Sequence, residues 1–457
     1  MDLKELLKSL QIDYTDAEYD DFIARMLKKH WNEYNKECMD ESIIIKNKIE
    51  ALPIAIPNGT VGKEYGVSFM VPKDLVEDYW IEGLEGTGLK YSIGEDSVCT
   101  IEGVPTEAGN YNLTIAYKYK GWVDGKKIMY RPFAIAINPD PKSLWKNIPT
   151  PTEIEYYQPD IDSAYVKVES IDGVPQKDIV AASQRGRSHA HEGRPRDDHF
   201  RVEYLDNCGW YILAVADGAG SAKYSRKGSW LACDTSVEHC KAFFSDEKKL
   251  KDFEEYITTY KNELGGEYQK MMTDEIYQLV GNAAFKSYKA IEVEANAKGV
   301  PTKNYATTLL LAVCKKFDFG WFVASFWVGD GAMCLYDQNR QYIKMLGVPD
   351  EGEYSGQTRF LTMPEIFKDA ASIYSRLRFS IEHDFTALML MTDGVSDPMF
   401  ETDANLNKLE KWDALWNNIT KEVELTDDNT ESQYQLLKWL EFWSQGNHDD
   451  RTIAILY

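Results

Sequence analysis

The spacing of apolar residues changes twice along the chain. Up to about residue 50, apolar side chains recur at steps of three and four residues, as at Phe22, Met26 and Trp31, and this period predicts an amphipathic helix. Thr15 and Glu18 lie three residues apart at its start, which is the spacing of a capping box. We interpret residues 1–50 as a helical segment that packs on other parts of the protein; a dedicated docking helix is the alternative.

From residue 51 to residue 139, short alternating runs replace the helical period. Four apolar side chains alternate there with polar or small residues, namely Tyr111, Leu113, Ile115 and Tyr117. This alternation, with Gly and Pro between the runs, predicts a small β-sandwich. The stretch from Ile101 to Tyr111 resembles the turn of bacterial immunoglobulin-like modules, which usually bind a partner or act as spacers. Residues 140–159 are rich in Pro, Lys, Asn and Thr and predict a linker.

Residues 160–457 carry a mixed pattern of strands and helices. Short apolar or alternating runs predict strands at Trp210–Ala216, Trp321–Val328, Ala387–Thr392 and Thr452–Tyr457. Between the first two of these runs, apolar residues keep helical steps from Trp230 to Phe244. Because strands cluster with strands and helices with helices, the pattern favours an α+β fold of antiparallel sheets covered by helices.

Composition narrows the classes of function. The net charge of −23 argues against nucleic acid as a partner, yet acidic side chains suit Mn²⁺ or Mg²⁺. The seven cysteines form no Cys-x-x-Cys pair, so neither a zinc site nor a disulfide framework is expected, and free thiols fit a reducing cytoplasm. The N-terminus lacks the apolar core of a signal peptide, and no apolar run reaches the ~20 residues that span a bilayer. We therefore expect a cytoplasmic protein without a membrane partner.

Acidic residues at the ends of predicted strands carry the candidate chemistry. Four such positions exist: Asp197-Asp198, Asp217-Gly218, Asp393-Gly394 and Asp449-Asp450. A rigid sheet can hold carboxylates in place, and hard divalent cations require several oxygens at fixed distances. One Asp-Gly pair is usually only a turn. Four acidic positions beside apolar strands indicate a metal centre instead.

The order of the motifs makes a family resemblance specific. The chain reads, in order, Asp217-Gly218-Ala219-Gly220, Ala306-Thr307-Thr308, Gly329-Asp330-Gly331, Thr392-Asp393-Gly394 and Asp449-Asp450-Arg451-Thr452. This series resembles the protein phosphatase 2C (PPM) family over residues 180–457, and the segment from Gly186 to Asp198 resembles a bacterial branch of it. The resemblance implies a four-layer sandwich of two antiparallel sheets flanked by helices. It also implies a metal-dependent phosphatase that hydrolyses phosphoserine and phosphothreonine in proteins.

The resemblance further implies roles for individual residues. Six would hold two Mn²⁺ or Mg²⁺ ions: Asp197, Asp198, Asp217, Gly218, Asp393 and Asp449. Asp217 would bridge the ions, and the Gly218 carbonyl would bind one of them directly or through water. Asp393 and Asp449 would hold the first ion. Asp197 would bind the second, with Asp198 beside it as a ligand or support. A water between the ions would attack phosphorus in line.

Three positions depart from the family pattern. Ala219 stands where eukaryotic members often carry a histidine, which leaves the acid for the leaving group open between solvent and a histidine of segment 189–199. Asn304 or Lys303 replaces the aspartate that binds a third metal in many bacterial members, so two ions are expected. The family's phosphate-binding arginine would fall at Gly193.

Basic residues nevertheless gather beside the proposed site. Arginines stand at positions 185, 187, 194, 196 and 201, and the guanidinium fork suits phosphate oxygens. We choose Arg187 and Arg194 as the phosphate-binding candidates. The histidines at positions 189, 191 and 199 fit no common zinc site, and we interpret each as a surface loop residue.

Two alternatives and one insert complete the expectations. The first alternative is a phosphatase fold kept for binding alone, which the missing histidine and third-metal aspartate motivate. The second assigns to residues 1–150 the recruitment of a protein target or a partner such as the cognate Ser/Thr kinase. The insert at 346–385 holds Gly352 and Gly356 and a helical pattern over Ile366–Leu377. Its place in the family implies a flap that selects substrates.

Overall fold

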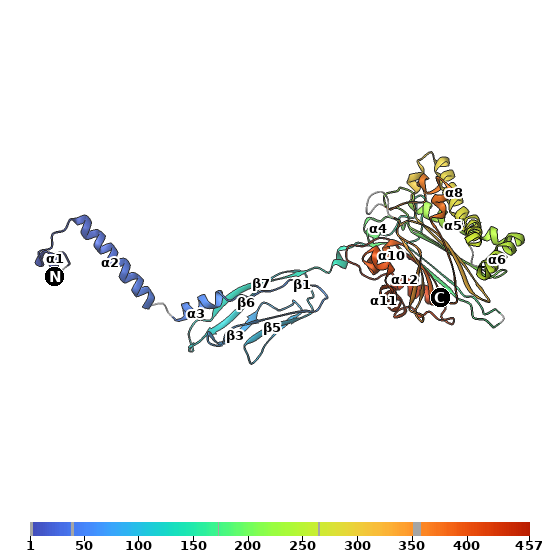
Figure 1. The fold of residues 1–457 in the computed structure, drawn as a ribbon. Coiled ribbons are helices and arrows are strands. Elements are labelled where there is room, and N and C mark those ends of the chain that lie inside the picture. The colour runs from blue at the N-terminus through green and yellow to red at the C-terminus, as the bar shows by residue number, and fades with distance from the viewer. Residues whose placement is uncertain (1–2, 38–40, 172, 264–265, 351–357) are drawn as a thin grey trace. The chain divides into compact units, whose positions relative to one another are not determined.

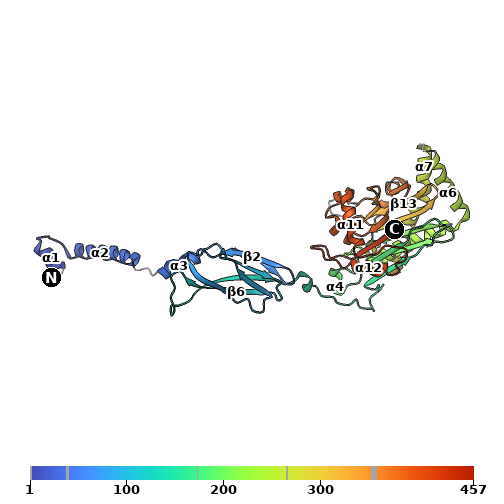
Figure 2. The same cartoon turned by 90° about the horizontal axis from the view of Figure 1, so that it is seen from below.

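The computed structural model describes residues 3–37, 41–171, 173–263, 266–350 and 358–457. It divides into two units, with the boundary between Leu144 and Trp145 (Figure 1; Figure 2). No helix among the described residues is both long and apolar enough to cross a membrane.

The first unit begins with helices, as the period of its sequence predicts. They are α1 (Leu3–Ser9), α2 (Asp16–Glu37) and α3 (Glu41–Glu50). The predicted capping box is confirmed at the start of α2, because the Glu18 amide donates to Thr15 Oγ1 at 3.3 Å and the Thr15 amide donates to Glu18 Oε2 at 2.9 Å. The side chains of Phe22 and Trp31 are 41% and 64% exposed. The packing partner expected for this helix is therefore not found among the described residues.

Strands make up the rest of the first unit, in two sheets. One has the order β1-β7-β6-β3 and the other β2-β5-β4. The strands are β1 (Gly59–Thr60), β2 (Tyr65–Met70), β3 (Val76–Glu82), β4 (Leu89–Ile93), β5 (Val98–Gly103), β6 (Gly109–Tyr119) and β7 (Met129–Asn138). One core joins both sheets, with Phe69 of β2 and Ile101 of β5 packed together with Leu113 and Ile115 of β6. The alternation read from β6 thus corresponds to one buried face.

Two antiparallel sheets form the centre of the second unit. The five-stranded sheet has the order β10-β11-β12-β13-β16, and the six-stranded sheet has the order β15-β14-β17-β18-β9-β8. The first comprises β10 (His199–Leu205), β11 (Trp210–Ala216), β12 (Leu309–Phe317), β13 (Gly320–Val328) and β16 (Leu377–Glu382). The second comprises β8 (Ile161–Val166), β9 (Ile179–Gln184), β14 (Ala332–Asp337), β15 (Tyr342–Gly347), β17 (Ala387–Met391) and β18 (Arg451–Leu456).

Helices cover the outer faces of these sheets (Figure 1). The five-stranded sheet is covered by α5 (Ser225–Ser245), α6 (Glu247–Asn262), α7 (Gly266–Ile276) and α8 (Asn282–Lys298). The six-stranded sheet is covered by α10 (Asp393–Phe400), α11 (Leu409–Thr420) and α12 (Ser432–Trp439). Two short helices lie elsewhere, α4 (Arg187–Glu192) and α9 (Ala370–Tyr374).

Alternating residues of the strands separate the cores of the second unit. In β11, Leu213 faces the core between the sheets, where it joins Leu310 of β12 and Leu390 of β17. Its neighbour Ile212 faces α5 to α8. The period of two explains how one apolar strand serves both cores. The chain is thus a mixed α+β protein, as its sequence pattern predicts.

The predicted strands of the second unit are found with small shifts at their ends. The helical pattern over Ile366–Leu377 is divided in the structure: a 3₁₀ turn covers Pro364–Phe367, α9 follows, and β16 begins at Leu377. The glycines at positions 352 and 356 of the predicted flap lie outside the described residues.

Residues predicted as a linker belong mostly to the second unit. The Ile148 amide donates to the Ala190 carbonyl at 2.8 Å, and Thr150 Oγ1 donates to Asp160 at 2.6 Å. Gln158 Nε2 donates to the carbonyl of Arg226 at 2.7 Å. These hydrogen bonds hold residues 145–159 on the second unit, so the boundary lies nearer the start of the predicted linker than its end.

We expect two shortened chains, one beginning at Trp145 and one at Asp160, to differ in their free energy of unfolding. A chain beginning at Trp145 should unfold at the same denaturant concentration as the second unit of the full chain. A chain beginning at Asp160 should lose at least about 3 kcal/mol, because the three hydrogen bonds named above, of about 1 kcal/mol each, are removed together with others such as those of Tyr156 to Glu294 and of Arg185 to Asn147. Urea unfolding followed by circular dichroism measures the difference. Equal midpoints for the two shorter chains would show that residues 145–159 do not stabilise this unit.

Candidate metal centre

Three aspartates from three strand ends come together at the centre of the candidate site. Asp217 directly follows β11, Asp330 lies two residues after β13, and Asp393 lies two residues after β17. One carboxylate oxygen from each lies within 4.8 Å of the others. The two sheets therefore both contribute carboxylates to the cluster, although these residues lie far apart in the chain. Asp330 was not among the metal-binding residues expected from the sequence, although its motif, Gly329-Asp330-Gly331, was recognised there.

The geometry favours Asp198 over Asp197 as the fourth acidic residue of this cluster. Asp198 Oδ2 accepts hydrogen bonds at 2.8 Å from the hydroxyls of Thr392 and Thr452. Its other oxygen is buried and has no hydrogen-bond partner among the described residues. The carboxylate of Asp197 instead lies 3.6 Å from Arg194 and 3.9 Å from Arg226. Asp197 Oδ1 is also buried without a hydrogen-bond partner among the described residues. The charge of Asp198, and not that of Asp197, is among the main causes that raise the pKa of Asp217, which favours Asp198 as the fourth carboxylate. The sequence-based choice of Asp197 as ligand, with Asp198 as ligand or support, stays a prediction.

Burial and mutual repulsion both act on the carboxylates of the cluster. Burial, and then the charges of Asp393, Asp198 and Asp449, raise the pKa of Asp217 well above its ordinary value. Burial, and then the charges of Asp330 and Asp449, do the same for the pKa of Asp393. Burial, followed by the charge of Asp450, raises the pKa of Asp198 to about 7. A divalent cation among these groups would favour their charged forms.

Buried oxygens without hydrogen-bond partners test whether such a cation fits. Asp198 Oδ1 and Asp330 Oδ1 are both of this kind within the described chain. A buried carboxylate oxygen without a donor is costly, and binding to a hard cation would offset that cost. The donor set consists of oxygens, which is what Mg²⁺ and Mn²⁺ prefer. The residues present therefore fit divalent ions.

The glycine after each strand-end aspartate is required by close packing of the backbone. A Cβ atom at Gly218 would collide with the Asp197 carbonyl oxygen, and one at Gly394 would collide with the Asp450 carbonyl oxygen. These two contacts bring the four acidic segments against one another in pairs. In the structure these glycines admit the neighbouring backbone, which a side chain at either position would exclude.

The Ala306-Thr307-Thr308 motif supports the Asp217 loop. The Thr308 amide donates to the Asp217 carbonyl at 2.8 Å, and the Asp217 amide donates to Thr308 Oγ1 at 2.8 Å. The Ala219 amide donates to the Ala306 carbonyl at 3.0 Å. This second motif therefore holds the first one in position.

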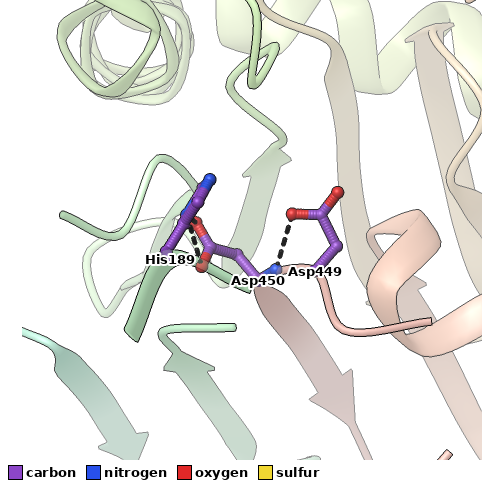
Figure 3. Close-up of side chains that lie close together, drawn as sticks. All are labelled: His189, Asp449 and Asp450. Carbon is purple, nitrogen blue, oxygen red and sulfur yellow. Dashed lines mark hydrogen bonds and ion pairs between the residues drawn. The ribbon is translucent and has the colours of Figure 1, made fainter. Parts of the chain in front are cut away.

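Asp450 forms the main polar support of the site (Figure 3). Its carboxylate accepts hydrogen bonds from the amides of Gly186 and Asp197, each at 2.5 Å. His189 Nδ1 lies 3.1 Å from both of its oxygens. Because these donors occupy the carboxylate, Asp450 acts as a support for the loops and not as a metal ligand. Asp449 Oδ1 accepts from the Asp450 amide at 2.8 Å, and one oxygen of Asp449 lies within 4.8 Å of atoms of His189 and Asp450.

His189 is buried, which corrects its interpretation as a surface loop residue. Only 4% of the residue is exposed. Burial alone would lower the pKa of His189, but the charge of Asp450 and their hydrogen bond raise it to about 9. The ring is therefore a cation at neutral pH and pairs with a buried carboxylate.

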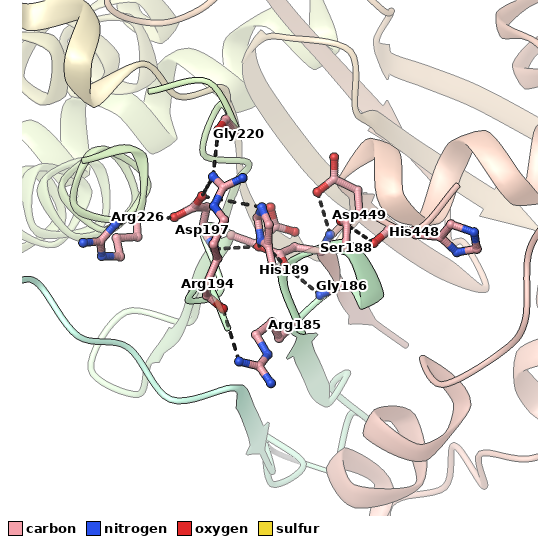
Figure 4. A network of polar contacts seen from close by, with 12 residues as sticks. Arg185, Gly186, Ser188, His189, Arg194, Asp197, Gly220, Arg226, His448 and Asp449 are labelled. Carbon is pink, nitrogen blue, oxygen red and sulfur yellow. Dashed lines mark hydrogen bonds and ion pairs between the residues drawn. The ribbon is translucent and has the colours of Figure 1, made fainter. Parts of the chain in front are cut away.

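The basic residues divide into two groups (Figure 4). Arg194 donates to the Gly220 carbonyl at 2.7 Å and so lies against the Asp217-Gly220 loop. Arg226, which the sequence did not single out, lies 3.9 Å from Asp197. It is in the first turn of α5, the helix that follows that loop. Arg187 instead donates to the Glu441 carbonyl at 3.0 Å and lies 5.3 Å from the ring centroid of Trp443. Of the two predicted phosphate-binding arginines, only Arg194 contacts the aspartate loops.

Comparison with known families now identifies the class of protein. A family model described as protein phosphatase 2C matches residues 185–441, which is more than half of the chain. The chain therefore belongs to the protein phosphatase 2C family. It is a metal-dependent protein phosphatase. The residues that match the family model all lie in the second unit.

Solved structures include similar folds at low identity. The catalytic domain of the serine/threonine phosphatase PstP, in complex with 2 manganese ions, is 15% identical with a TM-score of 0.36, and the match covers 61% of this chain and 96% of that one. The serine-threonine phosphatase 2C from Toxoplasma gondii is 13% identical with a TM-score of 0.40, covering 65% and 99%. The phosphatase PstP/Ppp of Mycobacterium tuberculosis is 13% identical with a TM-score of 0.35, covering 62% and 98%. We assign no residue from likeness at this level. A search of curated proteins found no match.

Removal of the Asp450 carboxylate should destabilise the protein. Asp450→Ala leaves the His189 ring cation and two buried amides without their acceptor, and loss of one partner of a buried pair costs about 3–5 kcal/mol. Urea unfolding in a chelating buffer measures this cost without any contribution from bound metal. Asp206→Ala, at an exposed turn, is the matched control and should unfold as the wild type does. A wild-type midpoint for Asp450→Ala would contradict the supporting role.

Proposed function

We propose that this chain hydrolyses phosphoserine and phosphothreonine in proteins, with two Mn²⁺ or Mg²⁺ ions held by the aspartate cluster. The observation that carries the proposal is the convergence of the Asp217, Asp330 and Asp393 carboxylates from three strand ends. Beside them, Asp198 and Asp330 hold buried oxygens without hydrogen-bond partners among the described residues. Hydrogen bonding within the protein does not explain that arrangement, whereas divalent cations do.

The proposed ligands rest partly on the contacts described above, which bring Asp217, Asp330 and Asp393 together. The assignments of Gly218 and Asp449 rest on the family resemblance. Asp217 lies at the centre of the cluster and is assigned to both ions, with the Gly218 carbonyl beside it. Asp393 and Asp449 are assigned to the first ion. Asp198 is assigned to the second, while Asp197 pairs with Arg194 and Arg226 and supports the loop. Asp330 lies within reach of Asp217 and Asp393 and joins the same set.

The chain's own residues would position the phosphoryl group. Arg194 is 39% exposed on its side chain and lies between the Gly220 carbonyl and Asp197, so a rotation could bring its fork to phosphate oxygens. Two bound cations supply an activated water and offset the charge that develops on the phosphoryl oxygens. His189 is buried against Asp450, so we assign the proton for the leaving alcohol to solvent.

We also propose finer features of the fold, together with the branch of the family and the location of the protein. The order helix, sheet, sheet, helix among the cores supports the four-layer sandwich. The segment from Gly186 to Asp198 supports a bacterial branch, and free buried thiols support a cytoplasmic location and a role in bacterial signalling. Two sheets around one core support an immunoglobulin-like module at residues 51–139, after a helical segment at 1–50.

The catalytic proposal predicts a large effect of one substitution. Asp217→Asn should lower the rate of phosphate release from a phosphothreonine peptide with Mn²⁺ by about 100-fold or more, since loss of bridging charge removes several kcal/mol of stabilisation. Asp206→Asn changes the same chemical group at an exposed turn and should keep full activity.

The same assay separates the proposal from its alternative. Equal activity of wild type and Asp217→Asn would refute the assignment of Asp217. Absence of activity in both, together with a purified protein that binds no divalent ion by elemental analysis, would favour a phosphatase fold kept only for binding. Activity that disappears with a chelator and returns with Mn²⁺ supports the enzyme.

For the first unit, we propose recruitment of the phosphoprotein substrate or a cognate Ser/Thr kinase. The exposed apolar residues of α2, such as Leu27 and Trp31, support a binding role. The chain beginning at Trp145 should hydrolyse p-nitrophenyl phosphate at the full-chain rate, because the aspartate cluster lies in the second unit. Its kcat/KM on the phosphoprotein should fall about tenfold or more. Unchanged kcat/KM on the phosphoprotein would refute recruitment.

A further inference from the structure

A second polar feature lies beside the segment Gly186–Ala190, apart from the aspartate cluster. It is a cavity of about 380 Å³ whose lining includes four basic residues, Lys146, Arg185, Arg187 and Arg451. Only two acidic residues line it, Asp160 and Glu441. In a chain with a net charge of −23, an excess of positive charge in one cavity is unusual and calls for an anionic partner.

The first of the arginines is already neutralised within the protein. Arg185 lies 3.1 Å from the Asp160 carboxylate. It also donates to Thr150 Oγ1 at 2.6 Å and to Asn147 Oδ1 at 2.8 Å. Asp160 is therefore fully engaged with Arg185 and Thr150, and its charge is not available to the other cations of the cavity.

Arg451 is the opposite case. It is 5% exposed and has no carboxylate partner among the described residues. Its guanidinium donates to the carbonyls of Leu440 and Phe442 at 2.7 and 2.5 Å and to Ser444 at 2.9 Å. Its Nε is buried without any acceptor in the described chain.

Arg187 adds a second cation without a carboxylate partner in the described chain. Its hydrogen bond goes to the Glu441 carbonyl, while Trp443 lies against its guanidinium. Two arginines that repel each other are thus held on one cavity wall. Protein carbonyls satisfy part of their hydrogen bonding but supply no negative charge.

We propose that this cavity binds a phosphate group, supplied either by a second phosphorylated residue of the substrate or by free phosphate. Several arginines with a lysine beside them suit a multiply charged tetrahedral anion better than a single carboxylate. Arg451 is two residues from Asp449, and Arg187 is two residues from His189, so the cavity adjoins the proposed active site. The choice of a phosphorylated substrate as one source rests on the proposed function; binding of phosphate itself does not.

Calorimetric titration of the full chain with inorganic phosphate in EDTA tests the cavity alone, because no metal centre can then form. The wild type should bind one phosphate per chain. Arg451→Met and the exposed-site change Lys146→Glu should each weaken binding about tenfold or more. Lys421→Glu reverses the charge of an exposed lysine outside the cavity and should bind as the wild type does. Lys146→Glu keeps the test valid if Arg451→Met fails to fold.

Kinetics with Mn²⁺ then identify the source of the phosphate. A peptide with two phosphoserines should have a KM about tenfold lower than its singly phosphorylated counterpart, and Lys146→Glu should abolish that ratio while p-nitrophenyl phosphate hydrolysis stays unchanged. Equal KM values for the two peptides, with phosphate binding intact in EDTA, would assign the cavity to free phosphate. No phosphate binding by the wild type, or binding that Lys146→Glu and folded Arg451→Met leave unchanged, would overturn the proposal. Failure of turnover alone would count against the phosphatase activity and leave the binding result standing.

Discussion

Repulsion between carboxylates held at the ends of two sheets is the constraint on which the second unit depends. Asp217, Asp330 and Asp393 place oxygens within 4.8 Å of one another, and burial together with neighbouring charges raises the pKa of both Asp217 and Asp393. Such an arrangement persists only when the surrounding structure is rigid. Helices that cover both sheets supply that rigidity through three apolar cores.

The loops between the strands are held by backbone contacts and by one buried ion pair. Gly218 and Gly394 allow the acidic segments to touch, and Thr308 joins the Asp217 loop to the next strand. Asp450 connects the amides of two further loop residues and the ring of His189. The acidic side chains of this site thus serve two purposes. Some provide free oxygens for cations, whereas Asp450 uses all of its hydrogen-bonding capacity inside the protein.

Sequence reasoning located most of the site because strand ends and glycines are visible in a sequence. Its preference for Asp197 over Asp198 had no physical basis in the sequence, since adjacent residues near a strand point in opposite directions and nothing in the sequence gives that parity. Asp330 follows an apolar strand as Asp217 and Asp393 do, so the same signal could have assigned it. The burial of His189 depends on Asp450, which lies 261 residues away, and the attachment of residues 145–159 depends on equally distant partners. Contacts of this kind follow from the fold alone.

Diffraction from crystals soaked in Mn²⁺, recorded at a wavelength where manganese scatters anomalously, tests the central claim most directly. The account predicts two anomalous peaks at the cluster, both bound by Asp217. Asp393 and Asp449 should bind the first ion, and Asp198 should bind the second. Asp450 should remain on the Gly186 and Asp197 amides. Peaks ligated by Asp197 in place of Asp198, or no manganese at the cluster, would contradict it.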